Sequence, residues 1–204
     1  FAWVDSERYE KDPKLVSELK DYDGVIVPGG FGTRGIEGII TAIKYVRTNN
    51  IPYLGLCYGM QLATIEIARH VAKIRTATTT EMDSEAKHQV IHIMPDQEKK
   101  LLKKDYGASM RLGSWPCKLK KGSKVRKSYG QNRVDERHRH RYEFNNEYRE
   151  RLEEAGLSIV GTSPDNHIVE IVELEDHPWF VGVQFHPEFK SRPLKPHPLF
   201  REFI

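Results

Sequence analysis

The sequence predicts an α/β fold with a central, mostly parallel sheet and helices on both faces. One observation behind this prediction is that short β-branched runs alternate with amphipathic segments over the first 70 residues. A second is a group of three further apolar runs between residues 157 and 185. Strands that alternate with helices favour parallel pairing, because each crossover helix returns the chain to the same end of the sheet. A length of 204 residues suits one domain with a substantial core, so we expect a single domain over 1–204.

The first half of the chain contains two strand-and-helix units. A β-branched strand is expected over 22–27 (YDGVIV), and it leads into the glycine-rich loop PGGFG. A second strand is expected over 51–56 (IPYLGL), followed by a helix from Gly59. Between the strands, residues 35–47 form a helix, since their apolar side chains recur at helical spacing. These side chains are Ile36, Ile39, Ile40, Ile43 and Val46 or Tyr45.

The second half adds more strands. HQVIHIM (88–94) is strand-like, and a polar surface helix over 146–155 ends at Gly156. LSIVGTS, HIVEIVEL and PWFVGVQF are three strands, with SPDN as a tight turn between the first two. The opening residues FAWVDS are also strand-like.

Composition is that of an ordinary soluble globular protein, 38% hydrophobic and 30% charged, and the net charge of +3 is too mild to indicate nucleic acid. No stretch approaches the roughly 20 apolar residues of a membrane span, and no basic-then-apolar leader is present.

Two cysteines without a CxxC spacing fit a reducing cytosol, so a cytoplasmic location is expected. No Cys/His set has zinc spacing, so no metal is expected. Because the chain opens with Phe1 rather than Met, we interpret it as part of a longer polypeptide.

Cys57 lies between the second strand and its helix, in the pattern G-x-C-x-G. A sharp turn there would project the thiol from the sheet edge, and it needs small neighbours such as Gly55 and Gly59. The helix N-terminus offers partial positive charge and free N–H groups, which favour a thiolate. The Tyr58 N–H is placed to stabilise an oxyanion. The alternative is a buried structural cysteine, which is how we interpret Cys117.

His186 is the candidate base among nine histidines. It ends a strand in FVGVQFHPEF and is followed by Pro187 and Glu188. Residues two apart in extended chain face the same side, and the proline favours extended geometry before it. Glu188 can therefore orient the imidazole of His186 for work with Cys57. The alternative is a partly exposed histidine near a strand end.

The loop VPGGFGTRG follows the first strand, and its glycines let the backbone approach a ligand. It lacks both the G-x-x-x-x-G-K-[ST] and the G-x-G-x-x-G phosphate signatures. We interpret the N–H near Gly30 as a second oxyanion donor.

Three of these segments, PGGFG, GLCYGMQ and GVQFHPEF, resemble the signatures of class I glutamine amidotransferases. The resemblance is closer still to the C-terminal glutaminase domain of CTP synthase, and it covers essentially the whole chain. It implies a flavodoxin-like, three-layer class I amidotransferase sandwich. The segments that carry it are PGGFGTRGIEG, MRLG (110–113), ERHRHRYEFN (136–145) and HPWFVGVQFHPEFKSRPLKPHPLF (177–200).

The resemblance implies that Cys57 attacks the side-chain amide of L-glutamine, that His186 protonates the leaving ammonia and then activates water against the thioester, and that Glu188 holds His186. A zwitterionic substrate needs one anion and one cation, and the resemblance supplies Glu81 for the α-ammonium and Arg141 for the amino-acid end. From the residues alone, a capping glutamate and a solvated arginine are the alternatives. Further glutamine contacts are implied at Gly30, Tyr58, Gly59, Met60 and Gln61.

The resemblance also implies partners outside this chain. Ammonia would pass to a synthase domain of the same polypeptide, where it aminates UTP activated by ATP. ATP and Mg²⁺ would bind only there, and the domain itself is expected to need no cofactor. GTP would act as activator near Phe31, Arg34 and Arg111, and the full enzyme would be a homotetramer.

Two departures from the resemblance stand out. Residue 58 is tyrosine where leucine is usual, which leaves the backbone N–H in place. The first strand and helix typical of the domain are not found, and FAWVDS resembles its second strand.

Two basic segments leave other functions open. Residues 99–127 hold eleven Lys or Arg against one Asp, and RHRHR covers 137–141. Such segments suit a nucleic-acid or anion-binding module, but no aromatic stacking platform accompanies them, so nucleic acid is the less favoured partner. A γ-glutamyl hydrolase or an amidotransferase of another pathway is a further alternative, against which the FKSRPLKPHP tail argues. A non-catalytic scaffold is the last, against which the complete triad argues.

Overall fold

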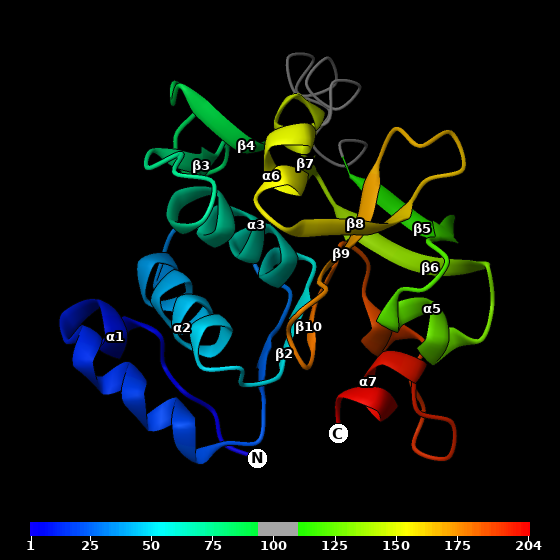
Figure 1. Ribbon diagram of the computed structural model, residues 1–204, viewed down its shortest axis with the longest axis horizontal. Helices are drawn as coiled ribbons and strands as arrows, with labels where there is room; N and C mark the ends of the chain where they lie inside the picture. Colours follow the sequence, from blue (N-terminus) through cyan, green and yellow to red (C-terminus); the bar gives the residue numbers. More distant parts are fainter. Residues whose placement is uncertain (94–109) are drawn as a thin grey trace.

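The computed structural model describes residues 1–93 and 110–204. Its centre is a seven-stranded sheet with helices on both sides (Figure 1). Met94 of the expected strand 88–94, and residues 99–109 of the lysine-rich segment, lie outside the described residues. In spatial order the strands are β1 (Val25–Val27), β2 (Tyr53–Leu56), β10 (Phe180–Val183), β9 (Val169–Leu174), β8 (Leu157–Thr162), β5 (Arg111–Leu119) and β6 (Arg133–His140).

The α/β fold class is confirmed, but the sheet is mixed where a mostly parallel one was expected. Only β1, β2 and β10 are parallel, and the pairs from β10 through β9, β8 and β5 to β6 are antiparallel. The reason lies in the connections. β1 and β2 are joined through a helix, whereas β8 and β9 are joined by the tight turn at SPDN, which forces antiparallel pairing.

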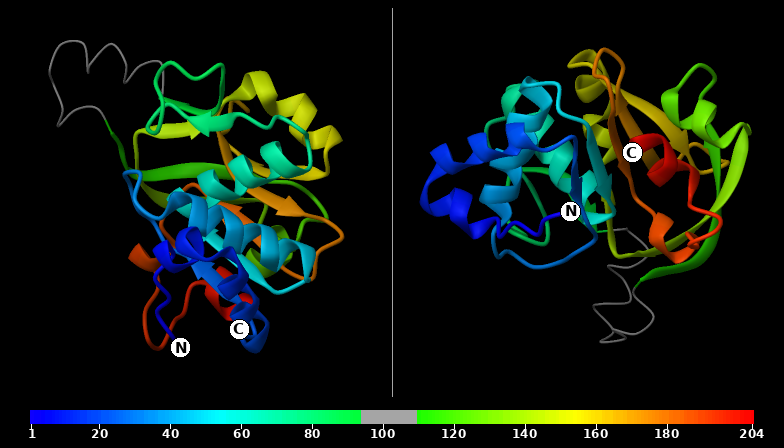
Figure 2. Two further views of the ribbon diagram at one scale, coloured as in Figure 1. Left: turned by 90° about the vertical axis from the view of Figure 1, so that its left-hand side faces the viewer. Right: turned by 90° about the horizontal axis from the view of Figure 1, so that it is seen from below.

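Two hydrophobic clusters lie on opposite faces of the sheet, and the view from below shows helices on both of these faces (Figure 2). Successive side chains of a strand point to opposite faces, so Tyr53 and Phe180 enter one cluster while Leu54 and Val181 enter the other. One face is covered by α1 (Glu7–Lys11), η1 (Pro13–Asp21), α2 (Ile36–Thr48) and α3 (Tyr58–His70), and the other by α5 (Lys124–Tyr129) and α7 (Pro198–Phe203). Over the described residues, none of the helices is both long and apolar enough to span a membrane.

A second, three-stranded sheet lies beside α3. It contains β3 (Ala77–Thr79), β4 (His88–Ile93) and β7 (Tyr142–Phe144). The chain passes from β6 of the large sheet into β7 of the small one through Arg141. η3 (Asn146–Tyr148) and α6 (Arg149–Glu154) then occupy the range predicted as helix, and Gly156 follows with φ 94°.

Two sequence predictions need correction. The strand expected at FAWVDS is absent, because Phe1 and Trp3 are exposed and find no core to pack against. In contrast, β5 and β6 were not predicted as strands, since their basic residues are typical of a solvated segment. In β6 exposed and buried residues alternate throughout, but most of the buried positions are polar, so no apolar period of two marks this strand in the sequence.

Candidate active site

Cys57 occupies a strained turn between β2 and α3. Its φ of 49° and ψ of −94° lie where non-glycine residues are rarely found. The turn is fixed by the Cys57 N–H, which donates to the Val183 carbonyl at 2.7 Å, and by the Gln61 N–H, which donates to the Cys57 carbonyl at 3.2 Å. The thiol thus sits at the carboxyl end of the parallel strands, beside the N-terminus of α3.

The glycines of G-x-C-x-G are required by close packing. A Cβ on Gly55 would lie 2.7 Å from the carbonyl carbon of Gly59. A Cβ on Gly59 would lie 2.3 Å from the carbonyl oxygen of Val27, on the neighbouring strand β1. Real Cβ atoms do not approach so closely, so only glycine allows the first turn of α3 to lie against β1 and β2.

His186 follows β10, and three contacts fix its imidazole. Its backbone N–H donates to the Arg137 carbonyl of β6 at 2.8 Å, and its Nδ1 lies 2.6 Å from Oε1 of Glu188. The Phe189 ring stacks on the imidazole with centroids 4.8 Å apart. Glu188 and Phe189 belong to the single turn η4 (Pro187–Phe189), so the local turn itself orients the ring.

The imidazole and the thiol meet at the glycine loop. A Cβ on Gly29 would lie 2.7 Å from Cε1 of His186 and 3.8 Å from Cβ of Cys57. Burial lowers the pKa of His186, but its interactions with Cys57 and Glu188 outweigh burial and raise the pKa to about 10. The raised pKa favours the protonated form of the imidazole, so His186 can hold a proton beside the sulfur of Cys57 and deliver it.

Gln184 is a site residue that the sequence reasoning did not single out. Its side-chain amide donates to Sγ of Cys57 at 3.6 Å and accepts from the Gln61 amide at 3.3 Å. The Gln61 amide also donates to the Tyr142 carbonyl at 3.0 Å. The available signal was position, because Gln184 lies two residues before His186 on one strand end.

Of the residues expected to contact glutamine, Met60 and Gln61 have buried side chains. The side chain of Met60 is fully buried and packs where Gly182 leaves room, so only its backbone can face a ligand. Gln61 is buried, with its amide already paired as described above. The Gly59 carbonyl accepts from the Tyr53 hydroxyl at 2.9 Å.

Glu81 and Arg141 both lie at the ends of strands of the small sheet. Glu81 follows β3, while Arg141 joins β6 to β7. Burial raises the pKa of Glu81, although the Gly32 N–H and the positive charge of Arg141 oppose this. The Nε atom of Arg141 is buried and has no hydrogen-bond partner among the described residues. The site therefore offers one acidic and one basic side chain, close enough for the charge of Arg141 to act on Glu81, as a zwitterionic ligand requires.

The three residues expected at an activator region differ in exposure. Phe31 is 89% exposed, and Arg34 on the same loop is exposed and pairs with Glu7 of α1. Arg111 is only 7% exposed, and its guanidinium donates to Oε1 of Glu170 at 2.7 Å.

The RHRHR segment forms the end of β6 and the residue that follows it. Its two histidines point inward, and Nδ1 of His138 lies 3.0 Å from Nε2 of His140. Burial lowers the pKa of His138 to about 2 and that of His140 to about 3. Both are neutral and enclosed, which removes them from any phosphate-binding surface.

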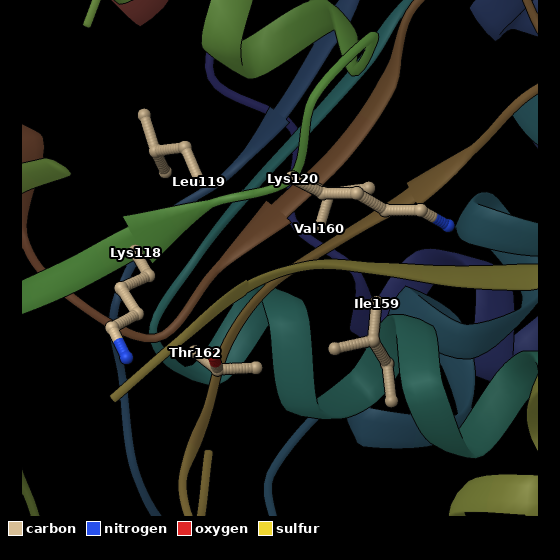
Figure 3. Close-up of a pocket in the computed structure, with 6 residues that line it drawn as sticks. All are labelled: Lys118, Leu119, Lys120, Ile159, Val160 and Thr162. Carbon is tan, nitrogen blue, oxygen red and sulfur yellow. The ribbon is translucent and has the colours of Figure 1, made fainter. Parts of the chain in front are cut away.

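A cavity of about 170 Å³ lies away from these residues, between β5 and β8 (Figure 3). None of its lining residues is a candidate site residue; they are Lys118, Leu119, Lys120, Ile159, Val160 and Thr162. Within 1–93 and 110–204, no three His, Cys, Asp or Glu side chains are grouped as a metal site would require.

The fold, together with the strained turn at Cys57 between β2 and α3 (the cysteine elbow), indicates which class of protein this chain belongs to. The class I glutamine amidotransferase family matches residues 3–204, and the chain belongs to that family. Within it, the chain belongs with the glutaminase domains of CTP synthase. The glutaminase domain of the Trypanosoma brucei CTPS, solved with bound acivicin, is 41% identical with a TM-score of 0.92, over 99% of this chain and 78% of that chain.

Two curated bacterial relatives agree. The CTP synthases of Carboxydothermus hydrogenoformans and Syntrophus aciditrophicus are 57% and 55% identical to this chain over 204 residues. That is 100% of this chain but 37% of each relative, so the chain spans little more than a third of their length.

Proposed function

We propose that this chain hydrolyses L-glutamine to glutamate and ammonia through a thioester on Cys57. The observation that carries the proposal is the grouping of Cys57, His186 and Glu188 around Gly29. A buried cysteine beside an imidazole that can take its proton, with a carboxylate to orient that imidazole, is the arrangement that acyl transfer needs.

The steps follow from the positions of the groups. The Cys57 thiol gives its proton to the His186 imidazole, and the resulting thiolate attacks the side-chain amide carbon. The N–H groups of Gly30 and Tyr58 stabilise the oxyanion that forms. His186 gives its proton to the departing nitrogen, so ammonia leaves and a thioester remains. The neutral imidazole then takes a proton from water, the hydroxide attacks the thioester carbon, and glutamate is released with the thiol restored.

Substrate recognition in this proposal comes from the charge pair beside the site. Glu81 would bind the α-ammonium, and Arg141 would bind the amino-acid end of the substrate. The support is that the charge of Arg141 acts on Glu81 and that the Arg141 Nε atom has no hydrogen-bond partner within the described residues. An amide without the zwitterionic end would be a poor substrate.

The use of the ammonia is proposed from the relatives. Because the matched relatives are CTP synthases, we propose that a synthase domain of the same polypeptide consumes the ammonia in ATP-dependent amination of UTP to CTP. ATP and Mg²⁺ belong to that domain. Activation by GTP, involving Phe31, Arg34 and Arg111, and assembly into a homotetramer are part of the same proposal.

The test is labelling of the intact protein with acivicin, the compound held by the trypanosomal domain. Mass spectrometry of the digested protein should find Cys57 modified, Cys117 unmodified, and protection by excess L-glutamine. Cys117 is the matched control, because it is the other cysteine of the chain and is fully buried. Modification of Cys117 instead, or labelling that L-glutamine does not slow, contradicts the proposal.

A further inference from the structure

Both backbone polar groups of Gly32 are held by side chains from other elements. The Gly32 N–H donates to Oε1 of Glu81 at 3.0 Å, and its carbonyl accepts a hydrogen bond from the Tyr58 hydroxyl. Gly32 has a φ of 85°, so no other residue type would adopt this backbone without strain. The loop is thus held by α3 on one side and by the segment after β3 on the other.

The Tyr58 ring also supports the loop directly. The residue is 6% exposed, and a Cβ on Gly30 would lie 3.2 Å from its Cδ1. Burial raises the pKa of Tyr58, and the negative charge of Glu81 raises it further. The hydroxyl therefore stays protonated and remains a donor.

We propose that Tyr58 is a positioning residue whose hydroxyl holds the loop 28–32 at the site, with Glu81 as the opposing arm of the clamp. The inference rests on the proposed glutaminase function. The clamp keeps the Gly30 N–H directed at the oxyanion before substrate binds. Because Glu81 is also the proposed ammonium ligand, substrate binding and oxyanion stabilisation share one side chain.

Removal of the hydroxyl should separate catalysis from binding. Tyr58→Phe keeps the ring against Gly30 but frees the Gly32 carbonyl. We expect kcat for glutamine to fall about tenfold, less than the loss of an oxyanion donor itself, with KM changed less than about twofold. Alkylation of Cys57 by iodoacetamide forms no oxyanion, so its rate should not change.

The experiment compares Tyr58→Phe with Tyr45→Phe in the intact protein. Tyr45 is the matched control, because its hydroxyl also donates to a backbone carbonyl, that of Ser17 at 3.5 Å, away from the site. The control should behave as the unmodified protein in all three measurements. An unchanged kcat in Tyr58→Phe overturns the proposal. A fall in the rate of Cys57 alkylation that matches the fall in kcat also overturns it, because the turn at Cys57 would then have moved.

Amide hydrogen exchange provides a readout that does not need glutaminase activity. Exchange at residues 29–32 should rise about tenfold in Tyr58→Phe and stay unchanged in Tyr45→Phe, because only the first substitution opens the clamp. Equal exchange in the two variants overturns the clamp whether or not glutamine is hydrolysed. An unmodified protein that releases no ammonia from glutamine would instead contradict the proposed function.

Discussion

Nδ1 of His186 lies 2.6 Å from Oε1 of Glu188, and a single residue, Pro187, separates the two in the sequence. The contact is local in sequence, yet it determines which ring nitrogen faces the thiol from a distant part of the chain. The contact affects the pKa of His186, the rate of glutamine hydrolysis and the free energy of unfolding, and each of these can be measured.

Cys57→Ala should lower glutamine hydrolysis by at least about a thousandfold, since no thioester can form. The fold should persist, because alanine occupies the same small space at the edge of the sheet. Ammonia release and circular dichroism measure the two effects. Cys117→Ala is the control and should retain its activity; hydrolysis that survives in Cys57→Ala would refute the role of this thiol.

His186→Ala should cost nearly as much as loss of the nucleophile, whereas Glu188→Ala should cost about a hundredfold, because an orienting group matters less than the acid and base. Steady-state kcat/KM values for the two variants provide the comparison. A larger loss for Glu188→Ala than for His186→Ala would mean that the carboxylate, and not the imidazole, is the principal acid and base.

Stability should depend on pH through His186. Its pKa is raised from 6.5 to about 10 in the folded state, so the protonated imidazole stabilises the fold fully below about pH 6.5, and this contribution is lost as the pH rises through 10. Glu188→Gln removes one of the groups that raise the pKa. The difference in unfolding free energy between the intact protein and Glu188→Gln should therefore be largest near pH 6 and vanish above about pH 10. Urea denaturation across this range checks it, and a difference that grows with pH would be the opposite of what we expect.

The salt bridge between α2 and α3 should matter more than surface pairs. Nε and one terminal nitrogen of Arg47 both donate to the Glu66 carboxylate at 2.7 Å, and Glu66 is fully buried. Arg47→Ala removes both of these hydrogen bonds and leaves the buried carboxylate with only the His70 imidazole, whose Nδ1 lies 3.3 Å from Oε1 of Glu66, so unfolding should become easier by about 3 kcal/mol. Arg8→Ala removes an exposed pair with Glu18 and should cost less than about 1 kcal/mol. Equal midpoints for the two variants in urea would contradict this ranking.

Much of the fold could be predicted from the sequence, because its signals are local. The apolar spacing in 35–47 and the β-branched run at 22–27 belong to elements buried on one or both faces. Strand β6 was missed because its inward positions are filled by Glu136, His138 and His140, whose polarity conceals the period of two.

The turn at Cys57, the glycine loop and the local pairing of His186 with Glu188 follow from the sequence alone, since each depends on residues a few positions apart. Three other contacts arise only in the assembled fold: Gln184 donates to the thiol, Glu81 and Tyr58 hold Gly32 from opposite sides, and Arg111 is buried against Glu170. Those contacts join segments 26 to 127 residues apart, and their geometry depends on how the whole sheet is assembled. No periodicity in the sequence predicts these contacts, because they form only when the helices and strands pack against one another.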